Sequence, residues 1–175
     1  MSRFIVTVVA AVALLAPGGA RAQAGFSLQG QVGGGETARD LKTSANWVYG
    51  AIGGLHFAGP LGLELDYQHA ENDLSGTGSL GTLKQDGLLG HLRIDFTRMT
   101  IVPFAYAGVG WVHYHGSALS SSVDRAVVPA GAGLEFHASP LVFGVRGEYQ
   151  WNTQTVAGKH VDYWKAVGTV GLRLP

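Results

Sequence analysis

The chain has 175 residues, a length that suits one domain with a sizeable core. Twelve basic residues balance twelve acidic ones, and no cluster of Lys and Arg occurs, so a nucleic-acid partner is not expected. Only 14% of the residues are charged, 27 are glycine and none is cysteine, which argues against an ordinary soluble surface and excludes disulfides and thiolate sites.

The first residues predict an export signal. Arg3 supplies the positive start, residues 4–15 form an unbroken run of small and apolar side chains, and Ala20-Arg21-Ala22 gives the small-x-small pattern of a cleavage site. A membrane-spanning anchor would need about 20 apolar residues, and Arg21 interrupts the run too early. We therefore expect a signal peptide over residues 1–22, with cleavage possible after 24, and a single domain over residues 23–175.

From residue 26 onward the apolar residues recur with a period of two, which predicts β-strands joined alternately by long polar loops and tight turns. An even number of strands with this alternation is typical of an antiparallel barrel in an outer membrane. The sequence therefore predicts an all-β fold, an eight-stranded antiparallel up-and-down transmembrane β-barrel. The predicted strands are residues 26–33, 46–57, 61–70, 87–96, 101–115, 128–137, 141–151 and 162–174, and the polar loops are residues 36–44, 71–85, 117–125 and 152–160.

Each strand has an apolar face with aromatic residues near the loop end, and this pattern indicates which face meets lipid. A soluble lipocalin-like barrel would show the same period with its apolar face inside. Aromatic girdles are typical of the lipid face of membrane barrels, which favours apolar side chains outside. The predicted loop-side girdle is Trp47, Tyr49, Tyr67, Tyr114, Tyr149, Trp151 and Trp164.

The opposite faces carry small residues and charges of both signs, which predicts a polar network inside the barrel. In strand 101–115 this assignment puts Gly108, Gly110 and Tyr114 toward lipid and Trp111 inside, a departure from large side chains outside. The predicted interior network is Glu64, Asp66, Arg93, Asp95, Glu135, Arg146, Glu148, Lys165 and Arg173.

Four motifs resemble the small outer-membrane β-barrel family, which includes OmpA-like transmembrane barrels and the opacity-type, porin-family surface proteins of Gram-negative bacteria. They are LGLELDYQH at residues 61–69, PFAYAGVGW at 103–111, AGLEFH at 132–137 and VRGEYQW at 145–151. The resemblance implies export through the periplasm to the outer membrane, contact with its lipid and lipopolysaccharide, and insertion by the barrel-assembly machinery. These motifs define a fold and name no ligand.

Three chemical alternatives remain beside a structural or surface-adhesion role. His113 and His115 are spaced to chelate a metal, alone or together with His91 or His137 of nearby strands, although histidines of a polar interior explain them as well. His115-Gly116-Ser117 resembles the His-x-Ser of lipid A deacylases, without a recognisable acid to complete a triad. The interior charges could line a narrow pore, but eight strands enclose a space that side chains just fill.

We therefore predict no catalytic residues, no cofactor and no metal site, and we expect any extracellular ligand to be bound by the four polar loops.

Overall fold

The computed structural model describes residues 25–39, 46–57, 59–73, 81–117, 119, 121–155 and 161–174. The predicted signal peptide and parts of all four predicted loops lie outside the described residues. In the described part of the chain, no helix is long and apolar enough to cross a membrane.

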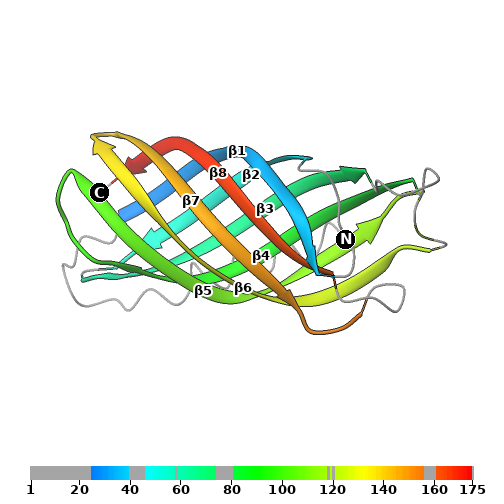
Figure 1. Cartoon of the computed structure of the whole chain (residues 1–175). Coiled ribbons are helices and arrows are strands. Elements are labelled where there is room, and N and C mark those ends of the chain that lie inside the picture. The colour runs from blue at the N-terminus through cyan, green and yellow to red at the C-terminus, as the bar shows by residue number, and fades with distance from the viewer. Residues whose placement is uncertain are drawn as a thin grey trace.

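Eight antiparallel strands form a closed barrel in which each strand pairs with its neighbour in the chain and β1 pairs with β8 (Figure 1). This confirms the predicted fold. The strands are β1 Gly25–Arg39, β2 Asn46–His56, β3 Leu61–Asp73, β4 Thr82–Asp95, β5 Ile101–His115, β6 Val123–Ala138, β7 Leu141–Asn152 and β8 Val161–Leu174.

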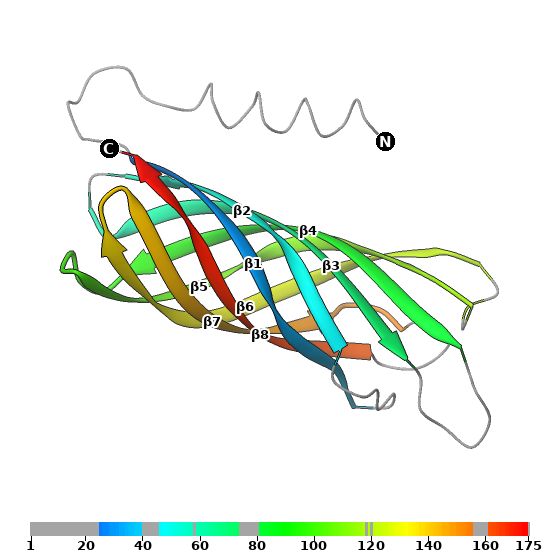
Figure 2. The same ribbon diagram turned by 90° about the horizontal axis from the view of Figure 1, so that it is seen from above.

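The barrel is closed by the register between its first and last strands. Phe26 of β1 pairs with Leu174 of β8, and the ladder continues to Arg39 opposite Val161. Figure 2 shows β1 and β8 side by side. Because every strand has two partners, the barrel presents no open sheet edge.

Several strands extend into segments that the sequence predicted as loops. β1 continues to Arg39, β3 to Asp73, and β4 already begins at Thr82. Polar composition suggested loops there, but the backbone pairing of neighbouring strands continues to Arg39 opposite Val161 and to Asp73 opposite Thr82. The connections at the loop end are correspondingly shorter than predicted.

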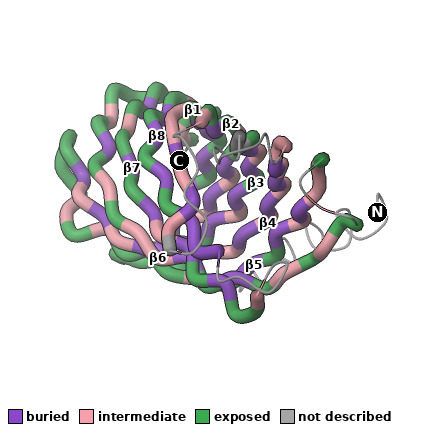
Figure 3. Tube along the Cα trace, turned by 45° about the vertical axis from the view of Figure 1, so that its right-hand side comes forward, coloured by how far each residue is buried: buried purple, intermediate pink, exposed green. Residues whose placement is uncertain are grey.

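Burial alternates along the strands, as the colours in Figure 3 show. The structure agrees with the predicted facing on seven strands, but the prediction for β5 was wrong. Phe104, Tyr106 and Tyr114 lie inside the barrel, whereas Trp111 is 66% exposed on the outside. The prediction placed the even positions outside because of their aromatic residues, although Gly108 and Gly110 share the glycine-rich character of the other inward faces.

The inward aromatics of β5 fit because β6 offers glycines opposite them. Tyr106 pairs with Gly131, and Phe104 pairs with Gly133. A Cβ at Gly131 would lie 2.4 Å from the Tyr106 hydroxyl, and a Cβ at Gly133 would lie 2.5 Å from the Phe104 ring. An aromatic side chain that covers a cross-strand glycine is a known way to pin strand register.

Candidate functional site

The lumen is the candidate site, because charged side chains from five strands converge there. The structure places all nine residues of the predicted interior network on inward positions. Their elements are β3 for Glu64 and Asp66, β4 for Arg93 and Asp95, β6 for Glu135, β7 for Arg146 and Glu148, and β8 for Lys165 and Arg173.

Arg93 is the centre of the half of the network nearer the turns. Its guanidinium forms two hydrogen bonds of 2.6 Å to the Glu135 carboxylate and one of 2.9 Å to Glu64, and its Nε donates to Asp95 at 2.6 Å. The same guanidinium lies 3.8 Å from the centre of the Phe104 ring. A completely buried arginine is thus matched by three carboxylates and an aromatic face, as a buried charge requires.

Arg146 bridges the lumen in the middle of the barrel. Its Nη2 donates to Glu64 at 3.0 Å, its Nε to the Tyr106 hydroxyl at 3.2 Å, and its guanidinium lies 4.0 Å from the centre of the Tyr106 ring. β7 and β3 lie on opposite sides of the eight-stranded ring. The pair therefore crosses the space through which a solute would pass.

Lys165 organises the half nearer the loops. Its ammonium lies 2.9 Å from Asp66, 3.3 Å from Glu148 and 2.5 Å from the Gln68 side-chain oxygen. Gln150 donates to Glu148 at 2.8 Å, which adds a neutral partner to this carboxylate.

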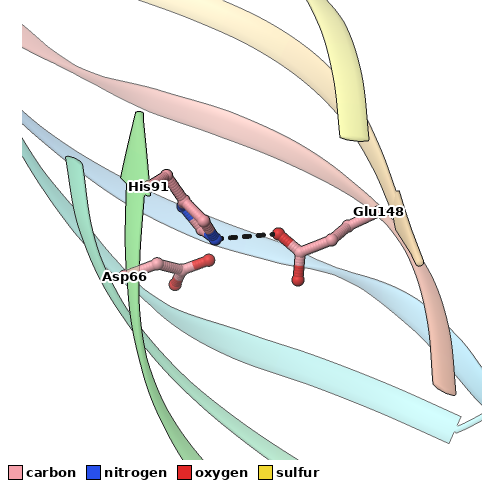
Figure 4. A group of neighbouring side chains, drawn as sticks. All are labelled: Asp66, His91 and Glu148. Atoms are coloured by element: carbon pink, nitrogen blue, oxygen red, sulfur yellow. Dashed lines mark ion pairs between the residues drawn. The ribbon is translucent and has the colours of Figure 1, made fainter. Parts of the chain in front are cut away.

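Asp66, His91 and Glu148 form a compact group whose possible ligand atoms lie within 4.8 Å of one another, and all three residues are buried. In Figure 4 the His91 ring points toward the Glu148 carboxylate, and Asp66 approaches the same space from below. The His91 Nε2 is 3.5 Å from Glu148 Oε2, and its Nδ1 is 3.9 Å from Glu64 Oε2. Within the described residues, neither ring nitrogen has a hydrogen-bond partner.

Apolar side chains fill the lumen at its loop end, above the charges. Tyr114, predicted for the outer girdle, belongs to this group: it is completely buried and accepts a hydrogen bond of 2.9 Å from Asn152. It faces inward because all the even positions of β5 do. The group consists of Leu83, Leu89, Val112, Tyr114, Val127 and Val161.

The other six residues of the predicted girdle lie on outward positions of the barrel. Trp47 is the most exposed of them at 75%, and Tyr149 is partly covered and donates a hydrogen bond to Asp162. Trp111, which the sequence reasoning placed inside, joins this ring. A second outward ring at the turn end is made by Phe26, Phe57, Phe96, Phe136 and Phe143.

Between the two aromatic rings, the outward positions of the described strands carry no charged side chain. On β5 these positions run from Ile101 to Trp111. At about 3.3 Å per residue and a tilt of about 40°, that length spans roughly 25 Å, which is the height of the apolar band of membrane barrels.

The histidine pair of β5 lies outside the barrel near the loops, and this corrects the prediction of an inward pair. His113 and His115 stack with their ring centres 5.5 Å apart, and His113 Nδ1 lies 2.7 Å from Asp124. His115 Nδ1 is 3.7 Å from Asp86, while the Ser117 hydroxyl accepts the backbone N–H of Thr82 at 3.0 Å. His91, by contrast, lies in the lumen and does not approach this pair.

Sequence reasoning missed the amides that complete the lumen. Gln29 donates to Glu135 at 2.9 Å, and Gln31 donates to Asp66. The sequence could have indicated that both side chains face the lumen, because they alternate with the outward apolar residues of β1. The position of His91 among Glu64, Asp66 and Glu148 had no sequence signal, since the four residues come from three separate strands.

No protein-family model matches the chain, and no curated protein matches its sequence. Solved structures with similar folds exist. Neisserial surface protein A has a TM-score of 0.71 and 13% identity over 84% of this chain and 96% of that one. The outer membrane protein OprG from Pseudomonas aeruginosa has a TM-score of 0.66 and 17% identity, covering 86% and 96% of the two chains.

A third similar structure is Ail, the attachment invasion locus protein of Yersinia pestis, in complex with the heparin analogue sucrose octasulfate. Its TM-score is 0.60 with 15% identity, over 86% of this chain and 99% of that one. Sequence identities this low show similarity of fold and nothing beyond it. The three solved structures agree with one another and with the architecture described above. The chain thus has the fold of the small outer-membrane β-barrels.

Proposed function

We propose that the protein is exported through the periplasm to the outer membrane, where it acts as a structural barrel that meets extracellular partners through its loops. The observation that carries the membrane location is the outward belt without charges, bounded by aromatic rings at both ends. Such a belt is stable in hydrocarbon and would be costly to expose to water.

Location and orientation are tested by cysteine labelling, because the chain contains no cysteine of its own. Asp124→Cys marks the loop end, where the side chain is 78% exposed, and Met99→Cys marks the turn end, where the residue is 72% exposed. In intact cells, a membrane-impermeant maleimide should label the Asp124→Cys protein alone, and both proteins after lysis. Equal labelling of the two in intact cells would reject the orientation, and recovery of a soluble periplasmic protein would reject the membrane location.

The surface role is supported by the loop composition and by the likeness to Ail. The four predicted loops together carry five acidic and five basic residues and are rich in Ser, Thr and Asn. Balanced charge argues against recognition of a strongly anionic ligand by charge alone. We expect contacts through hydroxyl and amide groups, so that binding survives high salt.

The corresponding experiment measures retention of cells on a surface coated with extracellular-matrix protein. Cells that display the wild-type barrel should be retained in low and high salt. A variant with residues 117–122 replaced by an Asn-Gly turn keeps the β5–β6 hairpin and should be retained less. Equal retention of cells with the wild-type barrel and cells with the variant would show that residues 117–122 do not contribute to binding.

A further inference from the structure

The nine-residue network at the centre of the lumen contains one more carboxylate than it contains Arg and Lys side chains. Five carboxylates of the network, Glu64, Asp66, Asp95, Glu135 and Glu148, face four cationic side chains, Arg93, Arg146, Lys165 and Arg173. Burying an unbalanced charge is costly, so such a site favours the binding of a cation.

Two buried polar atoms at the centre of this network have no hydrogen-bond partner in the described part of the chain. The His91 Nε2 and the Glu148 Oε2 are these two atoms; they point toward each other, and both side chains are completely buried. Their separation of 3.5 Å is too long for a direct hydrogen bond.

The same separation suits a metal ion placed between them. Zinc binds histidine nitrogen at about 2.1 Å and carboxylate oxygen at about 2.0 Å, and a tetrahedral angle then separates the two ligand atoms by about 3.4 Å. Asp66 supplies a third ligand atom within 4.8 Å of the other two. One imidazole and two carboxylates form a donor set that suits a borderline transition-metal ion better than Mg²⁺ or Ca²⁺.

We propose that Asp66, His91 and Glu148 bind a divalent transition-metal ion inside the barrel, with zinc as the test ion. The ion would join β3, β4 and β7 at the centre of the lumen and neutralise its excess of carboxylate. Lys165 competes for the same place, because its ammonium lies 2.9 Å from Asp66 and 3.3 Å from Glu148. Removal of this ammonium should therefore increase the affinity for metal.

The first experiment counts the metal that the barrel retains. The protein is unfolded in urea, refolded into detergent with ZnCl2 or MgCl2, dialysed, and assayed for metal per barrel. We expect about one zinc and no magnesium in the wild type, consistent with the donor set. His91→Gln and Glu148→Gln should lose the zinc, whereas a control with His113→Asn and His115→Asn should keep it, because those rings lie outside the barrel.

Three results of that experiment would overturn the proposal. Equal zinc in the wild type and in folded His91→Gln would show an adventitious ion only. Loss of zinc from the control with His113→Asn and His115→Asn would place the ion on the outer surface. A wild type that retains no zinc after dialysis would show that the group does not bind this ion.

The second experiment does not depend on folding of the His91 variant. Lys165→Met removes the competing ammonium and leaves Asp66 and Glu148 without it, so its melting temperature in detergent should fall without metal. Zinc should restore this melting temperature, because a ligand that binds only the folded barrel stabilises it. If zinc does not raise the melting temperature of Lys165→Met, the proposal is wrong; if it raises that of Lys165→Met with His91→Gln equally, His91 is not a ligand.

Discussion

Arg146 of β7 and Glu64 of β3 meet across the lumen, with 3.0 Å between Nη2 and Oε2. Arg146→Ala removes one of the positive charges that balance the buried Glu64 carboxylate. Removing one partner of a buried ion pair typically lowers the free energy of unfolding by about 3 to 5 kcal/mol. Because Arg93 still contacts Glu64 at 2.9 Å, we expect a loss in unfolding free energy near the lower end of that range. Urea titration in detergent, followed by heat-modifiable gel mobility, measures it.

Arg98→Ala is the matched control for that titration, since Arg98 is exposed at the turn between β4 and β5. Its unfolding free energy should equal that of the wild type. If Arg146→Ala were as stable as Arg98→Ala, Arg146 would not face a packed lumen.

The contact between Tyr106 and Gly131 predicts a second effect on stability. A Cβ at Gly131 would lie 2.3 Å from the Gly147 carbonyl oxygen as well as 2.4 Å from the Tyr106 hydroxyl, so Gly131→Ala should destabilise the barrel by about 1 to 3 kcal/mol through overpacking. Gly53→Ala serves as the control, because a Cβ at Gly53 meets nothing within 4 Å. Unfolding midpoints in urea compare the two, and equal midpoints would contradict the tight packing of Tyr106.

The corrected facing of β5 is tested by a charge at Val109, which is 63% exposed on the outer belt. An arginine on the lipid face costs about 2 to 4 kcal/mol near the bilayer midplane, so Val109→Arg should lower the unfolding free energy in lipid vesicles by that amount. Ser121→Arg adds the same charge at an exposed position between β5 and β6 and should have little effect. If Val109→Arg left the unfolding free energy unchanged, Val109 would not face lipid, and the facing that the sequence predicted for β5 would be right.

The ion pairs that cross the lumen also predict its conductance. Arg93 and Arg146 both bind Glu64 in the centre of the barrel, and apolar side chains such as Leu89 and Tyr114 pack above them. We expect no discrete current steps when the protein is inserted into planar bilayers. Regular single-channel steps would favour the porin-like alternative over a filled lumen.

The geometry of the His115-Gly116-Ser117 segment leads us to expect that the protein does not deacylate lipid A. The Ser117 hydroxyl is engaged by the Thr82 backbone N–H at 3.0 Å, and the carboxylate nearest His115 is 3.7 Å away. Purified protein incubated with lipid A should release no acyl chains, and His115→Ala should behave like the wild type. Release that disappears in His115→Ala would establish an enzyme.

Sequence by itself determined the number of strands, their order and the facing of seven of them, because side-chain alternation is a local property of an extended backbone. The inward charges followed from the same alternation. β5 was the exception, because its two faces each contain aromatic and small residues, so its alternation alone favours neither facing.

Only the tertiary structure decided which charges meet. Arg93 meets Glu64 of β3 and Glu135 of β6, and His91 reaches Glu148 on β7, at separations that no spacing in the chain encodes. Barrel closure and strand register set these distances, and register also decided the facing of β5 by placing Tyr106 opposite Gly131. The physical reason is that alternation needs one strand, whereas a lumenal site needs several strands held together at once.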